Sequence, residues 1–159
     1  IYTEQLLKKQ SSSKDNRIKF ILIVLTLGVV VMTLGNPLWL LGIFIMIGVD
    51  VWVFRSLNVE YEYLYINGNL DIDKIMSKSR RKKVFEMEIN DLEVMALRGE
   101  AELKMYQGLK AQDYSSGNTN SRQYEMIVIQ NGEKKRIIFE PNDVMVDGMR
   151  MLAPRKVHK

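Results

Sequence analysis

Hydrophobic residues form two uninterrupted runs near the start of the chain, and further along they alternate with polar residues. The runs cover 20–34 and 38–54, and the Gly35-Asn36-Pro37 sequence between them favours a turn that ends a helix. As helices of roughly 17 residues they would each span about 25 Å, slightly less than the hydrocarbon core of a bilayer. We therefore predict a transmembrane helical hairpin over 18–55.

The ends of this predicted hairpin carry residue types that anchor helices at a membrane surface. Lys19 and Arg55 flank the two apolar runs, and their long side chains can extend outward to water. Trp39 and Trp52 are expected near opposite interfaces, because indole rings concentrate there. The alternative is a buried hairpin in a soluble protein, but a domain of this size rarely encloses two helices that are apolar on all sides.

Lys and Arg residues predict the orientation of the hairpin. Basic residues precede the first run, Arg55 follows the second, and the turn between the runs carries no charge. We therefore expect a two-span protein of the cell membrane with both termini in the cytoplasm. A cleaved signal peptide is disfavoured, because no small-residue cleavage site follows the first run. The chain begins with Ile1 rather than Met, so either native residues precede it or it is an engineered fragment, and the sequence leaves both alternatives open.

Asp50 is the one ionisable residue deep within a predicted span. An unpaired carboxylate at that depth is costly, by about 3 kcal/mol. In an antiparallel hairpin Asp50 would lie near the depth of Lys19, and Arg55 follows it by about a turn and a half. We expect pairing with one of these cations; contact with a partner helix is the alternative.

After Arg55 the apolar positions alternate, which is typical of half-buried strands. Asn67-Gly68-Asn69 and Asn131-Gly132 are hairpin turn signals, and a helix is expected from Asp143 to about Leu152. Strands are predicted at 59–66, 70–76, 84–89, 92–97, 123–130 and 134–140, with an irregular stretch at 103–114 leading into a further strand.

This pattern predicts an α+β chain with three parts. Residues 1–17 are a cytoplasmic N-terminal segment, and 18–55 are the transmembrane hairpin. Residues 56–159 form a bent antiparallel sheet or small barrel of about seven strands, with a C-terminal helix covering one end.

The stretches VEYEYLYINGNLDIDKIMSKSRRKKVF and IIFEPND…GMRMLAPRKV resemble a family of small Firmicutes membrane proteins with two spans and a domain of unknown function. The layout is also similar to that of bacterial membrane proteins with a pleckstrin-homology (PH)-like domain. The resemblance implies a PH-like fold at 56–159 and no catalytic residues. Basic residues of the first hairpin loop mark phosphoinositide-binding PH domains, but here that loop is the uncharged Asn67-Gly68-Asn69, so the resemblance does not imply phosphoinositide recognition.

The amino-acid composition limits the kinds of catalytic and metal site that the chain can form. The chain has no Cys, and its one His, His158, is next to the C-terminus. Disulfides and thiolate zinc sites are therefore excluded, and histidine-based triads or metal sites are disfavoured. We expect no cofactor, no metal site and no enzymatic activity; carboxylates such as Asp71, Asp73 and Glu140 are the alternative, without a defined acid pair.

A cluster of basic residues between two predicted strands is the main candidate site. It is expected to form a loop and contains Lys78, Arg80, Arg81, Lys82 and Lys83, with no acid among them. Against an anionic leaflet each charge would contribute about 1 kcal/mol. The alternative is a solvated loop that keeps a sheet edge from aggregating.

Two further patterns, a row of tyrosines and a pair of aspartates, could serve either a functional or a purely structural role. Tyr61, Tyr63 and Tyr65 share one strand face, and such a row is more typical of core packing than of a stacking platform. Asp71 and Asp73 share another face but lack the further oxygen ligands of a calcium loop.

Nucleic acid is not expected as a partner, because residues 55–159 hold 18 basic and 16 acidic side chains. We predict a non-enzymatic, membrane-anchored interaction module that binds a protein partner or a membrane complex at the cytoplasmic face. The alternative is a domain that senses anionic membrane lipids through the basic loop 78–83. The identity of the partner and the oligomeric state are left open.

Overall fold

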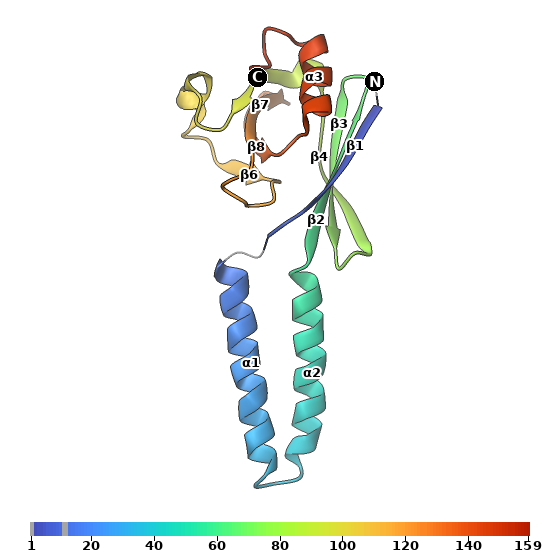
Figure 1. The fold of residues 1–159 in the computed structure, drawn as a ribbon, viewed down its shortest axis with the longest axis vertical. Coiled ribbons are helices and arrows are strands. Elements are labelled where there is room, and N and C mark those ends of the chain that lie inside the picture. Colours follow the sequence, from blue (N-terminus) through green and yellow to red (C-terminus); the bar gives the residue numbers. More distant parts are fainter. Residues whose placement is uncertain (1, 11–12) are drawn as a thin grey trace. The chain divides into compact units, whose positions relative to one another are not determined.

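The computed structural model describes residues 2–10 and 13–159 (Figure 1). The chain divides into two compact units. One, the helical unit, comprises 13–59 and 76–80; the other, the PH-like unit, comprises 2–10, 60–75 and 81–159. Residues 1, 11 and 12 of the predicted N-terminal segment lie outside the described residues.

The helical unit is built from two long helices, α1 (Ser13–Thr33) and α2 (Trp39–Ser56), which lie side by side (Figure 1). Helix α1 begins before the apolar run, and Asp15 in its first turn is favourably placed toward the positive end of the helix dipole. In the turn between the helices, Asn36 Oδ1 accepts a hydrogen bond from the Leu38 amide at 3.1 Å. The predicted helical hairpin is thus present.

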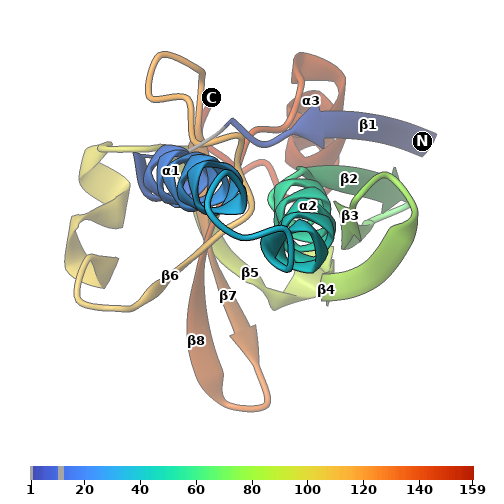
Figure 2. The ribbon, with the colours of Figure 1, turned by 90° about the horizontal axis from the view of Figure 1, so that it is seen from below.

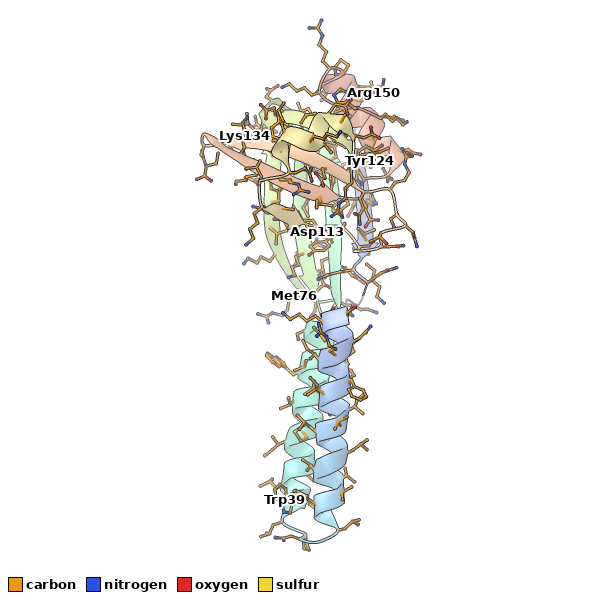
Figure 3. The ribbon with its side chains drawn as sticks, turned by 90° about the vertical axis from the view of Figure 1, so that its left-hand side faces the viewer. Trp39, Met76, Asp113, Tyr124, Lys134 and Arg150 are labelled. Carbon is orange, nitrogen blue, oxygen red and sulfur yellow. The ribbon has the colours of Figure 1, made fainter. Side chains whose placement is uncertain are left out.

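Both helices are long and apolar enough to cross a membrane. No described residue of α1 or α2 is buried, and their side chains project outward along the length of the helices (Figure 3). A helical hairpin in the core of a soluble protein would have its apolar side chains enclosed. The exposed apolar surface instead suits a two-span membrane protein.

Over its described residues, the PH-like unit consists of two four-stranded sheets and one helix, seen from below in Figure 2. The first sheet has the order β1-β2-β3-β4 and the second the order β5-β7-β8-β6. The strands are β1 (Tyr2–Lys8), β2 (Val59–Ile66), β3 (Asn69–Met76), β4 (Arg80–Glu88), β5 (Leu92–Leu97), β6 (Ala111–Asp113), β7 (Tyr124–Gln130) and β8 (Glu133–Phe139). Two 3₁₀ turns, η1 (Ile89–Asp91) and η2 (Ala101–Tyr106), precede β5 and β6, and α3 (Asp143–Leu152) follows β8. The predicted succession of strands followed by a final helix is confirmed.

Strand β1 is an addition to the sequence-based prediction, which assigns residues 1–17 to a separate segment. It pairs with β2 in antiparallel register from Tyr2 opposite Ile66 to Lys8 opposite Glu60. The Gln5 side chain also donates to the Glu140 carbonyl at 2.8 Å and accepts from the Asn142 amide at 2.8 Å. The sequence of β1 does not alternate strictly, so its strand conformation depends on a partner distant in sequence. The described residues therefore form eight strands rather than about seven.

The two Asn-Gly turns have the backbone that the sequence predicts. Asn67 and Gly68 have φ values of 47° and 90°, and Asn131 and Gly132 have 54° and 77°. Positive φ at both central residues is the signature of a type I′ hairpin turn, which Asn and Gly adopt at low cost. These turns connect β2 to β3 and β7 to β8.

The core of the PH-like unit lies between the inward faces of the sheets and under α3. Tyr61, Tyr63 and Tyr65 are buried, which confirms the core reading of the tyrosine row. The Tyr63 ring packs edge-on against Phe139 with the ring centres 5.7 Å apart. The other large, fully buried side chains include Leu70, Ile72, Leu92, Met95, Leu103, Tyr124, Met126, Ile127 and Ile137.

A buried ion pair joins β7 and β8 next to Gln107, which directly follows η2. Glu125, whose side chain is 1% exposed, accepts hydrogen bonds from Arg136 Nε at 3.1 Å and Arg136 Nη2 at 2.8 Å. Gln107 Nε2 donates to the same carboxylate at 3.2 Å, and Arg98 Nε lies 3.5 Å away. Burial raises the pKa of Glu125, but the bonds from Arg136 and Gln107 and the two arginine charges outweigh it, and the pKa lies below its ordinary value.

Candidate functional site

The basic cluster is placed on a hairpin rather than in a loop. The turn between β3 and β4 comprises only residues 77–79, and Arg80, Arg81, Lys82 and Lys83 belong to β4. The loop prediction for these four residues is wrong because four consecutive cations carry no apolar alternation from which a strand could be recognised. Backbone pairing with β3 extends the strand to this point instead.

Two of the five cations are already paired within the sheet. Arg81 lies 2.7 Å from Glu62 and 3.2 Å from Asp73, and hydrogen bonds to these carboxylates raise its pKa. Lys83 lies 2.9 Å from Glu86 and 3.7 Å from Asp71. The bond to Glu86 and the charge of Asp71 raise the pKa of Lys83 as well. Asp71 and Asp73 therefore act as strand-face partners of cations.

The other three cations, Lys78, Arg80 and Lys82, are exposed and form no ion pair with any described residue. Cross-strand charge compensation divides the cluster into a paired part and an unpaired part, a difference that the sequence does not reveal. The unpaired part is the stronger candidate for an external ligand, because a ligand there would not have to displace a carboxylate.

The β3–β4 turn is attached to the end of α2 within the helical unit. The Ser77 amide donates to the Asn58 carbonyl at 2.9 Å, and Ser77 Oγ donates to the Arg55 carbonyl at 2.8 Å. Figure 3 shows Met76, the last residue of β3, beside this end of the helix. The hydrogen bonds hold the turn that carries Lys78 at Arg55, the basic residue that follows the second predicted span.

Asp50 has a different partner from the one predicted. In the described part of the chain it forms no ion pair with Lys19 or Arg55; instead Thr26 Oγ1 of α1 donates to Asp50 Oδ2 at 2.5 Å. Lys19 Nζ lies over the Phe54 ring, 5.7 Å from its centre. Hydrogen bonding across the hairpin satisfies one carboxylate oxygen without a cation, because a hydroxyl on the facing helix is closer.

The two tryptophans lie toward opposite ends of α2. Trp39 is the first residue of the helix, next to the interhelical turn (Figure 3). Trp52 lies one turn before Arg55. Both indoles are exposed, Trp52 more than Trp39. Their role as interface anchors stays a prediction.

A second surface feature, on α3, has no counterpart in the sequence-based prediction. Val144, Met151 and Leu152 of this helix are exposed, while Met145 and Met149 point into the core. A hollow of about 160 Å³ is lined by Tyr65, Asn67, Gly148, Met151 and Leu152. The amphipathic pattern of the helix predicts its buried side, but the exposed apolar residues near its ends could be recognised only once the packing direction was known.

Metal chemistry has no candidate in the part of the chain that the structure describes, where no group of three or more His, Asp or Glu side chains could hold an ion. His158 lies 3.8 Å from Glu102 at the surface.

Comparison with known proteins identifies one family. Searches of the curated proteins and of the solved structures returned no match. A family model described as "Bacterial PH-like domain (DUF6106)" matches residues 1–159. The match includes the helical hairpin and strand β1 as well as the rest of the PH-like unit. The chain therefore belongs to the bacterial PH-like domain family DUF6106.

Proposed function

We propose that this protein is a non-enzymatic, membrane-anchored interaction module whose PH-like domain binds a protein partner or membrane complex at the cytoplasmic face. The observation that supports it is the exposed apolar end of α3 beside a hollow of about 160 Å³. Met151 and Leu152, 70% and 56% exposed, border this hollow. Exposed apolar side chains around a small concavity are typical of sites that accept an anchoring side chain from a partner.

The α3 site can be tested by photo-crosslinking in native membranes. With a benzophenone amino acid at position 151, we expect a discrete protein adduct, because a bound partner would cover this residue. The matched control is the same amino acid at the exposed polar residue Asn120. Leu152→Asp should reduce the adduct yield about tenfold, since a charge at the rim of an apolar contact costs more than 1 kcal/mol. Equal labelling at 151 and 120 would contradict the proposal.

The cytoplasmic orientation is also a proposal, supported by the basic residues that flank the two spans. Because the chain has no Cys, single cysteines can report the side on which each segment lies. In intact cells a membrane-impermeant maleimide should label Asn36→Cys in the interhelical turn, but not Asn120→Cys until the cells are permeabilised. Labelling of Asn120→Cys in intact cells would reverse the topology.

A second candidate function is contact with anionic membrane lipids through the basic residues of the β3–β4 hairpin. One observation favours it: the turn that carries Lys78 is hydrogen-bonded through Ser77 to the end of α2. If α2 crosses the membrane, its end lies at the headgroup layer, where basic side chains meet lipid phosphates.

A further inference from the structure

We propose that Lys78 and Arg80 of the β3–β4 hairpin, together with Arg55 of α2, form a binding site for the phosphate group of an anionic phospholipid. The site rests on the membrane insertion and cytoplasmic orientation proposed above. It narrows the basic cluster to those residues that both lack an ion-pair partner and belong to the helical unit.

The charge balance of the helical unit supports this assignment. Lys19, over the ring of Phe54, places a cation of α1 at the level of the last turn of α2. Arg55 lies in that last turn, and the Ser77 bonds add Lys78 beside it. Within the described residues of this unit the acids are Asp15, in the first turn of α1, and Asp50, within the second span. The end of the hairpin is therefore strongly cationic, and an anionic ligand would meet attraction there.

The backbone conformation of the β3–β4 turn indicates that Ser77 and Lys78 are present for their side chains. Ser77 and Lys78 have φ values of 56° and 60°, and the Ser79 amide donates to the Met76 carbonyl at 3.2 Å, which closes a turn with positive φ at both central positions. The other two turns of this kind in the described chain use Asn-Gly. Non-glycine residues pay a backbone penalty in this conformation. In this turn the Ser77 side chain bonds to α2, and Lys78 supplies a cationic side chain that a Gly at the same position would lack.

The chemistry of the three cations suits a phosphate. A lysine ammonium is a compact point charge, whereas the planar guanidinium of Arg can donate two parallel hydrogen bonds to two phosphate oxygens. All three side chains are exposed. At about 1 kcal/mol per charge near an anionic surface, removal of Lys78 and Arg80 together corresponds to an effect of up to about 30-fold.

The native tryptophans allow a direct test in the full-length protein. The Trp39→Phe protein, reconstituted in vesicles, keeps Trp52 as its one tryptophan. The fluorescence of Trp52 is quenched with brominated phosphatidylglycerol and, separately, with brominated phosphatidylcholine. The ratio of the two quenching efficiencies gives the relative affinity for anionic lipid at this end of α2. Lys78→Ala/Arg80→Ala should lower this preference by up to about 30-fold. In Trp52→Phe protein, Trp39 at the other end of α2 should report no change.

Lys104→Ala/Lys110→Ala is the matched control, because it removes two exposed lysines that form no ion pair with a described residue. It should leave the Trp52 preference unchanged. Lys78→Gly should make the turn more stable in proteolysis assays, because Gly tolerates positive φ, and yet lower the lipid preference about fivefold. A loss of binding without a loss of stability separates a ligand contact from a structural role.

Several outcomes would overturn the site. One is an unchanged preference in Lys78→Ala/Arg80→Ala, and another is an equal loss in the lysine control. Abolition of the preference by soluble glycerol phosphate at constant ionic strength would assign the site to a free phosphate compound instead of a lipid. If neither lipid quenches Trp52 or Trp39, the hairpin does not insert and the site fails with it. The α3 adduct is measured independently, so failure of the protein-partner proposal remains distinguishable.

Discussion

Glu125→Leu is expected to destabilise the PH-like unit by about 3–5 kcal/mol, because it leaves the Arg136 guanidinium buried beside an apolar side chain. Arg136 is 12% exposed, and two of its nitrogens bond the Glu125 carboxylate. The loss would also remove one of the two acceptors of Gln107 Nε2 and the ion-pair partner of Arg98. Pulse proteolysis of the full-length protein in urea, with the hairpin held in nanodiscs, measures the change.

The control for this substitution is Glu133→Leu, an exposed position at the start of β8 with no ion pair to a described residue. Its effect should stay within about 0.5 kcal/mol. Because the folded-state pKa of Glu125 lies below its ordinary value, its stabilising contribution is complete above that ordinary value and is lost as the pH falls through the lower folded pKa. The difference between wild type and Glu125→Leu should therefore shrink in acid. Equal effects of the two leucine substitutions at neutral pH would show that the ion pair is not stabilising.

Tyr63→Phe is expected to cost about 1–3 kcal/mol, because it removes one hydroxyl that bonds two backbone groups, one buried and one partly buried. The Tyr63 hydroxyl donates to the Tyr114 carbonyl and accepts from the Glu140 amide at 3.2 Å. Phenylalanine keeps the ring contact with Phe139 but leaves both backbone groups without this partner. The same proteolysis assay gives the change in the free energy of unfolding.

Tyr2→Phe is the matched control, since this tyrosine is 62% exposed and its hydroxyl bonds the neighbouring Glu4. Burial raises the pKa of Tyr63 far above its ordinary value. The contribution of its protonated hydroxyl is therefore complete below the ordinary tyrosine pKa, near 10, and is lost as the pH rises above it. The gap between wild type and Tyr63→Phe should narrow in that alkaline range. A gap that is already absent at pH 7 would contradict the role assigned to the hydroxyl.

Most of the strands and helices could be predicted from local patterns. Strand β5 at Leu92–Leu97 and strand β2 at Val59–Ile66 match their predicted ranges, because apolar side chains alternate along them and turn residues bound them. Strand β6 comes from the stretch that the pattern left irregular, and it pairs in parallel with β8. Such a short strand has too few residues to show a period, so its position depends on the strand beside it.

The candidate sites were predictable only in part. A cluster of five cations is visible in the residues themselves, but its division into paired and unpaired members depends on which carboxylates face it across the sheet. The hydrogen bonds from Ser77 to Arg55 and Asn58 join residues about twenty positions apart, and no spacing rule connects them. The partner of Asp50 likewise depends on which sides of α1 and α2 face each other, because this brings Thr26 closer to Asp50 than Lys19 or Arg55.

The amino-acid sequence by itself determined where apolar surface would be continuous and where it would alternate, and hence the helical hairpin, the Asn-Gly turns and the buried tyrosine row. These features depend on the local period of side chains and on the backbone preferences of single residues. Only the tertiary structure decided that residues 2–8 form a strand beside β2, that Arg81 and Lys83 are neutralised, and that the β3–β4 turn is bonded to the end of α2. Each of these three features is a contact between residues that only folding brings together. Such contacts depend on the geometry with which strands and helices pair, and not on composition.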